Sequence, residues 1–182
     1  MNTLAYTYFL KAYDAYPHDL AETYENLQLA LSYDDCLVEA NVLMGKMLAY
    51  QLGDYAFAME YYRRAIMQDP QRLDTYVNAS WAAVMAGELQ EAEGMILYAM
   101  ELPSEGSGIL FQRLSMVQEM RGQYREAFET LGKGIDASMW PDQVEWLRNE
   151  KKRVDAKLHL QKAPEPVKAE PKKNLWKNRL SF

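Results

Sequence analysis

Side chains that could act as a nucleophile, a general base or a metal ligand are few in this sequence, and they are scattered. The two histidines, His18 and His159, lie near opposite ends of the chain and belong to no recognisable catalytic or metal-binding pattern. There is no HExxH, no CxxC, no GxSxG and no glycine-rich phosphate loop. Because catalysis needs such groups gathered at one place, the sequence predicts a protein that is not an enzyme and holds no cofactor or metal ion.

One short acidic run, next to the only cysteine, needs separate consideration. Asp34 and Asp35 could bind a cation, but no further ligand follows at a useful spacing, so we interpret them as solvated turn residues. Cys36 cannot form an internal disulfide, and nothing indicates an oxidising compartment. Since unpaired cysteines are most often buried, we expect Cys36 to lie inside the protein rather than to be reactive.

The composition is that of a soluble protein with an acidic balance. The 182 residues include 20 Lys and Arg against 26 Asp and Glu, which gives a formal net charge of −6. Nucleic acid is therefore a poor partner, since phosphate binding depends largely on Lys and Arg. No stretch approaches the roughly 18 apolar residues of a membrane span, and the N-terminus lacks the basic leading region of a signal peptide. We expect a cytoplasmic protein without stable membrane insertion.

The sequence offers no reactive centre that its secondary-structure elements would have to position. The most regular feature of these elements is instead a repeat. Apolar residues recur at helical spacing in pairs of segments that are separated by a turn. Small residues recur at equivalent positions, in three series: Gly53, Gly87 and Gly122; Ala58, Ala92 and Ala127; Ala65, Ala99 and Gly134. Such residues let paired helices approach closely, so that each helical hairpin buries one face against its neighbour.

Turn and cap residues mark the boundaries of these hairpins. Pro17 ends the first helix, and Asp19 can cap the second. Gly53 suits a left-handed helix end, and Asp54 can cap the helix that follows. The chain divides into units at about 4–37, 38–72, 73–106 and 108–140, a capping helix at 141–162, and a tail at 163–182.

This plan resembles the tetratricopeptide repeat (TPR) over about residues 4–162. The matching residues are Gly53-Asp54-Tyr55, Ala58, Tyr62, Ala65 and Asp69-Pro70 in one unit, Tyr76, Gly87, Ala92, Ala99 and Pro103 in the next, and Gly122, Tyr124 and Ala127 in the last. Two units depart from the pattern, because Pro17-His18 stands at one turn and Gly53 follows Gly45 by eight positions instead of seven. The resemblance implies an all-α fold, a right-handed superhelical α-solenoid of about four TPR-like helical hairpins plus a C-terminal capping helix.

In a TPR stack the first helix of each hairpin lines a concave groove, and the resemblance therefore implies where a partner would bind. By the repeat register, the groove-facing side chains are Leu43, Met47, Tyr50, Val77, Asn78, Trp81, Met85, Gln112, Arg113, Met116 and Met120. Any single one of them could instead pack between helices, but as a set they lie on the face that the stack leaves open. A groove with flexible Met side chains suits an extended or helical segment with apolar anchors.

Family members that bind acidic C-terminal peptides use a clamp of Lys, Asn and Arg side chains in this groove. Asn78 and Arg113 fall at two of the corresponding places, whereas Ile109 stands where a Lys would be. The clamp is therefore incomplete, and the resemblance does not favour this class of peptide.

The tail at 163–182 differs from the rest in composition. Three prolines stand near its start, and five cations against two acids give it a charge of +3. Its apolar residues are Leu175, Trp176, Leu180 and Phe182, and two of these, four positions apart, would share one face of a helix. The tail is either an unstructured terminus or a segment that docks on its own groove, on a second copy in self-association, or on a separate partner.

These observations favour a non-enzymatic interaction module, an adaptor or scaffold, whose partner is another protein or a peptide. The alternative is a chaperone. Small acidic TPR proteins that escort bacterial secretion substrates are similar to this chain in size, charge and number of repeats.

Overall fold

Helices account for the architecture of the chain. In this computed structural model, residues 3–103 and 108–162 are described, and within them there is no strand. The helices are α1 (Thr3–Ala15), α2 (Leu20–Tyr33), α3 (Val38–Lys46), the π-helix η1 (Met47–Leu52), α4 (Tyr55–Gln68), α5 (Leu73–Ala86), α6 (Leu89–Glu101), α7 (Gly108–Met120), α8 (Tyr124–Ala137) and α9 (Pro141–Lys162). The tail residues Leu175, Trp176, Leu180 and Phe182 lie outside the described residues, so their docking stays a prediction.

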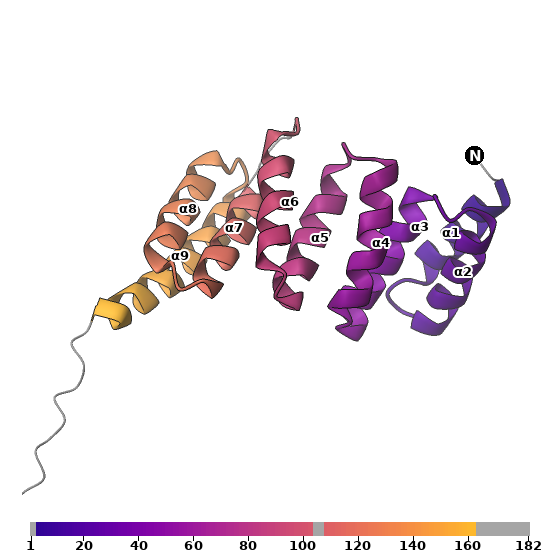
Figure 1. Cartoon of the computed structure of the whole chain (residues 1–182), viewed down its shortest axis with the longest axis horizontal. Helices are drawn as coiled ribbons and strands as arrows, with labels where there is room; N and C mark the ends of the chain where they lie inside the picture. Colours follow the sequence, from indigo (N-terminus) through magenta and orange to yellow (C-terminus); the bar gives the residue numbers. More distant parts are fainter. Residues whose placement is uncertain (1–2, 104–107, 163–182) are drawn as a thin grey trace, which may run out of the picture.

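The helices form antiparallel hairpins that lie side by side along the long axis of the molecule (Figure 1). The hairpin α1–α2 occupies one end, and α8 with α9 occupies the other. Each helix packs mainly on the helices next to it in the chain, as in a solenoid. The predicted all-α solenoid of helical hairpins with a final helix is confirmed.

The ends of the helices follow the local chemistry that the sequence predicts. Asp19 accepts a hydrogen bond from the backbone N–H of Glu22 at 2.9 Å, and Asp54 accepts one from Phe57 at 3.1 Å. Gly87 ends α5 with a φ of 81°, in the left-handed region where a Cβ is strained. These caps satisfy backbone groups that a helix end leaves without partners.

The recurring small residues lie where the helices approach one another most closely. Ala58, Ala92 and Ala127 have no exposed surface. A Cβ added to Gly45 would come within 2.7 Å of the ring of Tyr62, and one added to Gly134 within 2.8 Å of the Cβ of Phe111. The repeat pattern therefore reflects contact between backbones and buried rings, as expected for a close-packed interior.

The extra residue between Gly45 and Gly53 is accommodated by the π-helix η1. In α5 and α7 the turn is closed by hydrogen bonds that span five residues, from the N–H of Glu88 to Ala83 and from that of Gln123 to Gln118. After η1 the equivalent bond runs from the N–H of Asp54 to Leu48, across six residues. The helix has widened by one residue, and the turn keeps its place in the repeat.

Cys36 is exposed, so our expectation that it is buried is wrong. It lies in the short loop between α2 and α3, where its backbone N–H donates to Asp34 Oδ1 at 3.1 Å. A hydrogen bond with Asp35 raises the pKa of the Cys36 thiol, which disfavours the reactive thiolate.

Across the part of the chain that the structure describes, no helix is long and apolar enough to cross a bilayer.

Candidate partner-binding groove

The odd-numbered helices form one continuous row. Contacts join α1 to α3, α3 to α5, α5 to α7 and α7 to α9, whereas contacts between successive even-numbered helices are sparser. The row of odd-numbered helices is therefore the shorter, inner side of the curved stack. We interpret this row as the lining of the predicted groove, where exposed side chains would face a partner.

Two aromatic rings from neighbouring hairpins make the centre of this face. The rings of Tyr50 and Trp81 are stacked, with centroids 4.5 Å apart and planes 7° from parallel. Tyr55, at the start of α4, meets the Trp81 ring edge-on at 5.4 Å. The Tyr50 hydroxyl donates to Asn78 Oδ1 at 3.0 Å, and the Asn78 amide donates to the Asp74 carbonyl oxygen at 2.6 Å. We call Tyr50, Trp81 and Asn78 the aromatic shelf.

Tyr50 of the shelf lies within the π-helix η1. Counted from Gly45, Tyr50 occupies the position that Met85 and Met120 hold in the next two hairpins. The extra residue of η1 follows this position, so that Tyr50 keeps its place in the groove although the helix is one residue longer. All three of these side chains are exposed.

Arg113 on α7 is a cation whose charge acts on Tyr50 of the shelf. Its Nη1 donates to Gln112 Oε1 at 2.7 Å and to the sulfur of Met116 at 3.7 Å. Its Nε is buried without a hydrogen-bond partner, and among the described residues no carboxylate forms a salt bridge with it. A half-buried guanidinium has five donors, and here most of them are unused.

The charge of Arg113 and the Tyr50 hydroxyl influence each other. Burial raises the pKa of Tyr50, and the positive charge of Arg113 opposes that rise. Burial likewise lowers the pKa of Arg113, because it penalises the charged form of the guanidinium. Residues from three successive hairpins therefore converge on one site, which combines an aromatic surface with a cation that lacks a counterion.

The groove residues that the sequence predicts divide into two groups. Exposed or half-buried on this face are Tyr50, Val77, Asn78, Trp81, Met85, Arg113, Met116 and Met120. Leu43, Met47 and Gln112 are buried and are not accessible to a partner, which corrects that part of the prediction.

Each buried member has its own physical reason. Leu43 lines a small pocket together with Phe9 and Tyr13 of α1, and only 5% of its surface is exposed. Met47 holds the position of Ala82 and Val117 when the register is counted from Gly45, and all three are in the core. Gln112 has only 5% of its surface exposed, and its amide oxygen already accepts from Arg113.

The sequence reasoning missed the part of the groove that the first hairpin contributes. Phe9 and Tyr13 of α1 border a cavity of about 70 Å³ together with Arg72 and Asp74. Arg72 there donates to Asp74 at 2.8 Å and to Glu39 at 3.3 Å, so its charge is neutralised within the chain. The helical spacing of Phe9 and Tyr13 is the signal that could have located this part, once the register is extended into the degenerate first unit.

Residues with the potential for chemistry do not gather in this groove. His18 lies in the turn before α2, and His159 lies near the end of α9, where it faces Asp155 at 3.5 Å. Ligand atoms of Asp34, Asp35 and Cys36 lie within 4.8 Å of one another in the α2–α3 loop. Asp34 Oδ1 accepts a hydrogen bond from the backbone N–H of Cys36 within this turn, and the interpretation of both acids as solvated turn residues stays a prediction.

Comparison with known proteins places the fold. No protein-family model and no curated protein matches the chain. Among solved structures, it is similar to MamA, with a TM-score of 0.67 and 19% identity over 86% of this chain and 91% of that one. It is similar to PilW, a type IV pilus biogenesis factor, with a TM-score of 0.69 and 18% identity over 85% of this chain and 72% of that one.

A third similar structure is a thermophilic TPR protein of Thermus thermophilus, with a TM-score of 0.65 and 12% identity. The match covers 84% of this chain and 81% of that protein. The turn residues, the buried small residues and these structural matches agree, and the chain has the fold of the tetratricopeptide-repeat proteins.

Proposed function

We propose that this protein is a non-enzymatic interaction module whose concave groove binds a segment of another protein across the aromatic shelf and Arg113. The observation that carries the proposal is the half-buried Arg113 guanidinium, which has no carboxylate partner and stands beside exposed aromatic and Met side chains. A bound segment would supply an acceptor oxygen to Arg113, and that hydrogen bond would be charge-assisted.

The apolar part of the groove determines what else the segment carries. Met85 and Met120 are 44% and 54% exposed, and each lies close to the end of its helix. Thioether side chains adapt to differently shaped apolar groups. The segment therefore carries at least one apolar side chain that covers the shelf, together with an acceptor for Arg113.

The test uses the full chain as bait, with charged substitutions at exposed groove positions. Met85→Glu and Met120→Glu should each reduce the amount of co-purified partner by roughly tenfold, which is the effect of losing an interface anchor. Met67→Glu is the matched control, because Met67 is 71% exposed on α4 and away from the groove. Equal recovery by all three variants would overturn the proposal.

Trp81 is less suitable for this experiment. Its ring stacks on Tyr50 and meets Tyr55, so Trp81→Ala would remove contacts within the fold as well as contacts with a partner. Each aromatic pair is worth about 0.5–1.5 kcal/mol. A lower thermal midpoint would accompany any loss of binding and would obscure its cause.

The chaperone alternative has one supporting observation, the Met side chains, since flexible surfaces can accept several different segments. The two functions differ in what happens to the partner after binding. An adaptor stays bound to a mature assembly, whereas a chaperone releases its substrate. A pulse-labelled partner that leaves the protein with time would favour the chaperone.

The role of the tail can be tested in the same assay. A chain that ends at Lys162 lacks the residues 163–182 and keeps all the described helices. If the tail contacts the partner, this truncation reduces recovery, and if it occupies the groove, the truncation increases recovery. Unchanged recovery would show that the tail does neither.

A further inference from the structure

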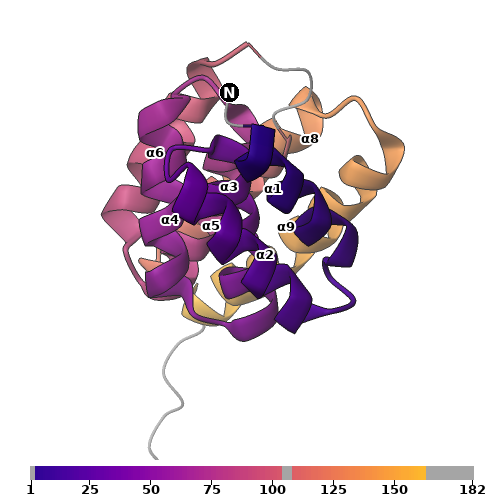
Figure 2. The ribbon, with the colours of Figure 1, turned by 90° about the vertical axis from the view of Figure 1, so that its right-hand side faces the viewer.

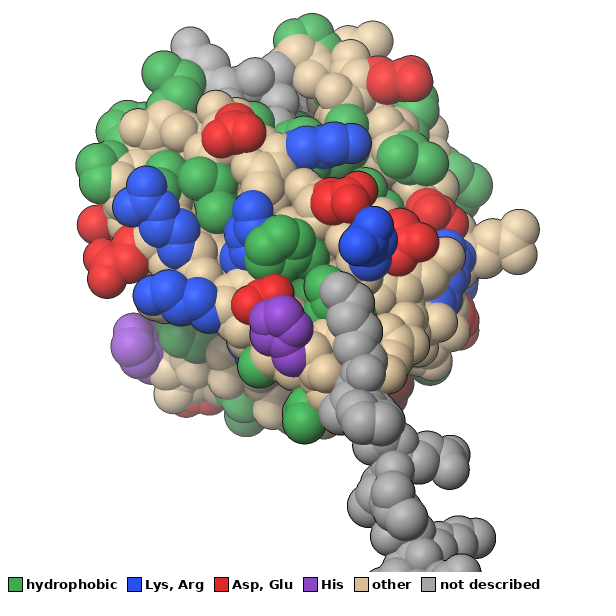
Figure 3. Space-filling model, turned by 90° about the vertical axis from the view of Figure 1, so that its left-hand side faces the viewer, with side chains coloured by type: hydrophobic (Ala, Val, Ile, Leu, Met, Phe, Trp, Pro, Cys, Tyr) green, Lys and Arg blue, Asp and Glu red, His purple; other side chains and the backbone are tan. Residues whose placement is uncertain are grey.

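The α8–α9 end of the molecule carries an open apolar pocket with a cationic rim. The pocket has a volume of about 350 Å³, and its lining residues are Phe128, Ile135, Arg148, Lys151, Lys152 and Asp155. Figure 3 looks onto this end of the molecule, where Lys and Arg side chains, with Asp and Glu among them, lie around hydrophobic ones. The pocket exists because α9 covers α8 but is followed by no further helix within the described residues.

The cations of this rim form no salt bridge with the residues that the structure describes. Arg153 and Lys157, further along α9, both pair with Glu119 at 2.7 and 3.3 Å. By contrast, no salt bridge of the described residues includes Arg148, Lys151 or Lys152. The Lys151 ammonium group instead lies 4.3 Å from the centre of the Phe128 ring. The pocket therefore suits an apolar side chain flanked by carboxylates.

The opposite end of the same molecule has the complementary charge. Residues 3–37 contain six acids and one Lys, a charge of −5, whereas α9, residues 141–162, contains six cations and four acids, a charge of +2. Figure 2 looks onto the first of these ends, with α1 and α2 in front. The hairpin α1–α2 at one end is thus acidic, whereas α9, the last described helix at the other end, is basic, although the net charge of the chain is −6.

Helix α2 presents a face that fits the pocket. Glu22, Glu25 and Leu29 are spaced three and four residues apart and so share one side of the helix. All three are exposed, with 41% of Leu29 accessible to solvent. The buried residues Thr23, Leu27 and Ala30 lie on the opposite side of α2, against the rest of the stack.

We propose that the protein associates head to tail with a second copy, with α2 of one copy docking against the α8–α9 pocket of the next. Leu29 enters the pocket over Phe128 and Ile135, and Glu22 and Glu25 face the rim cations. In this arrangement α2 of the second copy supplies the helix that α9 lacks, and the hairpin stack continues across the interface. The contact is heterologous, so it can repeat along a row of molecules.

The chain's own tail is a poorer occupant of this pocket. Residues 163–182 carry a charge of +3, and they would enter a site whose rim already has three cations and one acid, Asp155. Like charges at close range are unfavourable. Charge therefore selects the acidic hairpin of a second copy over the basic tail.

Charge reversal tests the interface with the full chain in sedimentation velocity experiments over a range of concentrations. The wild type should exceed its monomer mass of 21.1 kDa in about 0.05 M salt and revert towards it in about 0.5 M salt, because exposed charges are screened. The variant Lys151→Glu with Lys152→Glu should be monomeric, and so should Glu22→Lys with Glu25→Lys. An equimolar mixture of the two variants should associate again, since each then presents the complement of the other.

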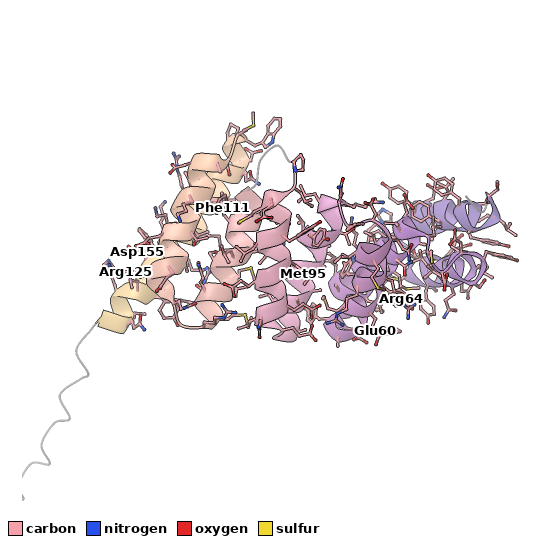
Figure 4. The ribbon with its side chains drawn as sticks, turned by 45° about the horizontal axis from the view of Figure 1, so that its top comes forward. Glu60, Arg64, Met95, Phe111, Arg125 and Asp155 are labelled. Atoms are coloured by element: carbon pink, nitrogen blue, oxygen red, sulfur yellow. The ribbon has the colours of Figure 1, made fainter. Side chains whose placement is uncertain are left out.

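The matched controls reverse exposed charges in the middle of the stack. Glu60→Lys and Arg64→Glu change α4 (Figure 4) and should leave association as in the wild type. Met85→Glu should also leave it unchanged, which separates this interface from the groove proposed above. A wild type that stays monomeric at low salt, or variants whose mixture does not associate, would overturn the proposal. So would association that is lost when residues 163–182 are removed but withstands both charge reversals.

Discussion

Two glycines show how backbone conformation, rather than available space, decides whether a side chain is tolerated. A Cβ at Gly87 or at Gly94 would meet no atom within 4 Å. Gly87 has a φ of 81° at the end of α5, while Gly94 lies inside α6. Gly87→Ala should therefore lower the free energy of unfolding by about 1–2 kcal/mol, the cost of a left-handed residue.

Gly94→Ala should raise the free energy of unfolding by up to about 1 kcal/mol, because alanine is the better helix former. Urea unfolding of the two variants beside the wild type measures both effects. Shifts of the same sign would contradict the argument, since the two sites differ in φ and not in crowding.

The roles of residues that act on nearby backbone groups were predictable from the sequence. The exposure of residues that contact several hairpins was less predictable. The caps Asp19 and Asp54 act on backbone groups three residues away, so their own neighbourhood determines them. Leu43 lies on the predicted face but is buried, in a pocket that Phe9 and Tyr13 of another hairpin also line. Nothing in the spacing within α3 reveals this burial, because it depends on how α1 packs against α3.

At the scale of elements, η1 shows that the turn keeps its place in the repeat even when the helix before it has one residue more. Deleting Gln51, which is exposed, would restore the seven-residue spacing of the following hairpins. A regular α-helix should then replace η1, with Tyr50 still in the groove. We expect the free energy of unfolding to change by about 1 kcal/mol or less, as for surface changes.

Deleting Ala86 is the matched control, since it is also exposed and also immediately precedes a turn. This deletion shortens a helix of normal spacing, so the turn at Gly87 would rotate and pull buried residues of α6 out of place. A loss of roughly 3 kcal/mol or more should follow, as for emptied core sites. Comparable thermal midpoints for the two deletion variants would contradict this account of η1.

The arrangement of the groove could not be derived from any single element. Arg113 and Tyr50 lie 63 positions apart, and the hairpin α5–α6 separates their own hairpins in the sequence. Each nevertheless affects the ionisation of the other. The sequence predicted that both face the groove, because both follow the repeat register. It did not show that Arg113 would lack a carboxylate, since that depends on every side chain within reach.

For the whole molecule, tyrosines of the central hairpins, buried to different extents, make stability depend on alkaline pH. Burial raises the pKa of Tyr50, Tyr61, Tyr62 and Tyr76 above the ordinary value of 10.0. In the unfolded chain these hydroxyls ionise near pH 10, while in the folded chain they stay neutral to a higher pH. The unfolded state then binds fewer protons, so stability that is complete below pH 10 is lost as the pH rises further.

Tyr62→Phe isolates one of these groups, because the Tyr62 hydroxyl is buried and has no hydrogen-bond partner among the described residues. Near pH 7 the variant should be as stable as the wild type or more so, since no hydrogen bond is lost. Above pH 10 the free energy of unfolding of the variant should rise relative to that of the wild type by up to about 1.4 kcal/mol per pH unit. This is the effect expected when unfolding releases one proton from the wild type and none from the variant.

Thermal melts between about pH 7 and pH 11 measure this difference, with Tyr13→Phe at an exposed tyrosine as the control. In a solenoid each hairpin is stabilised by its neighbours, so destabilising the central hairpins should unfold the whole stack in one transition. A constant difference between Tyr62→Phe and the wild type across this range would mean that Tyr62 ionises in the folded protein as it does in the unfolded chain. Alkaline loss of stability would then have to arise elsewhere in the stack.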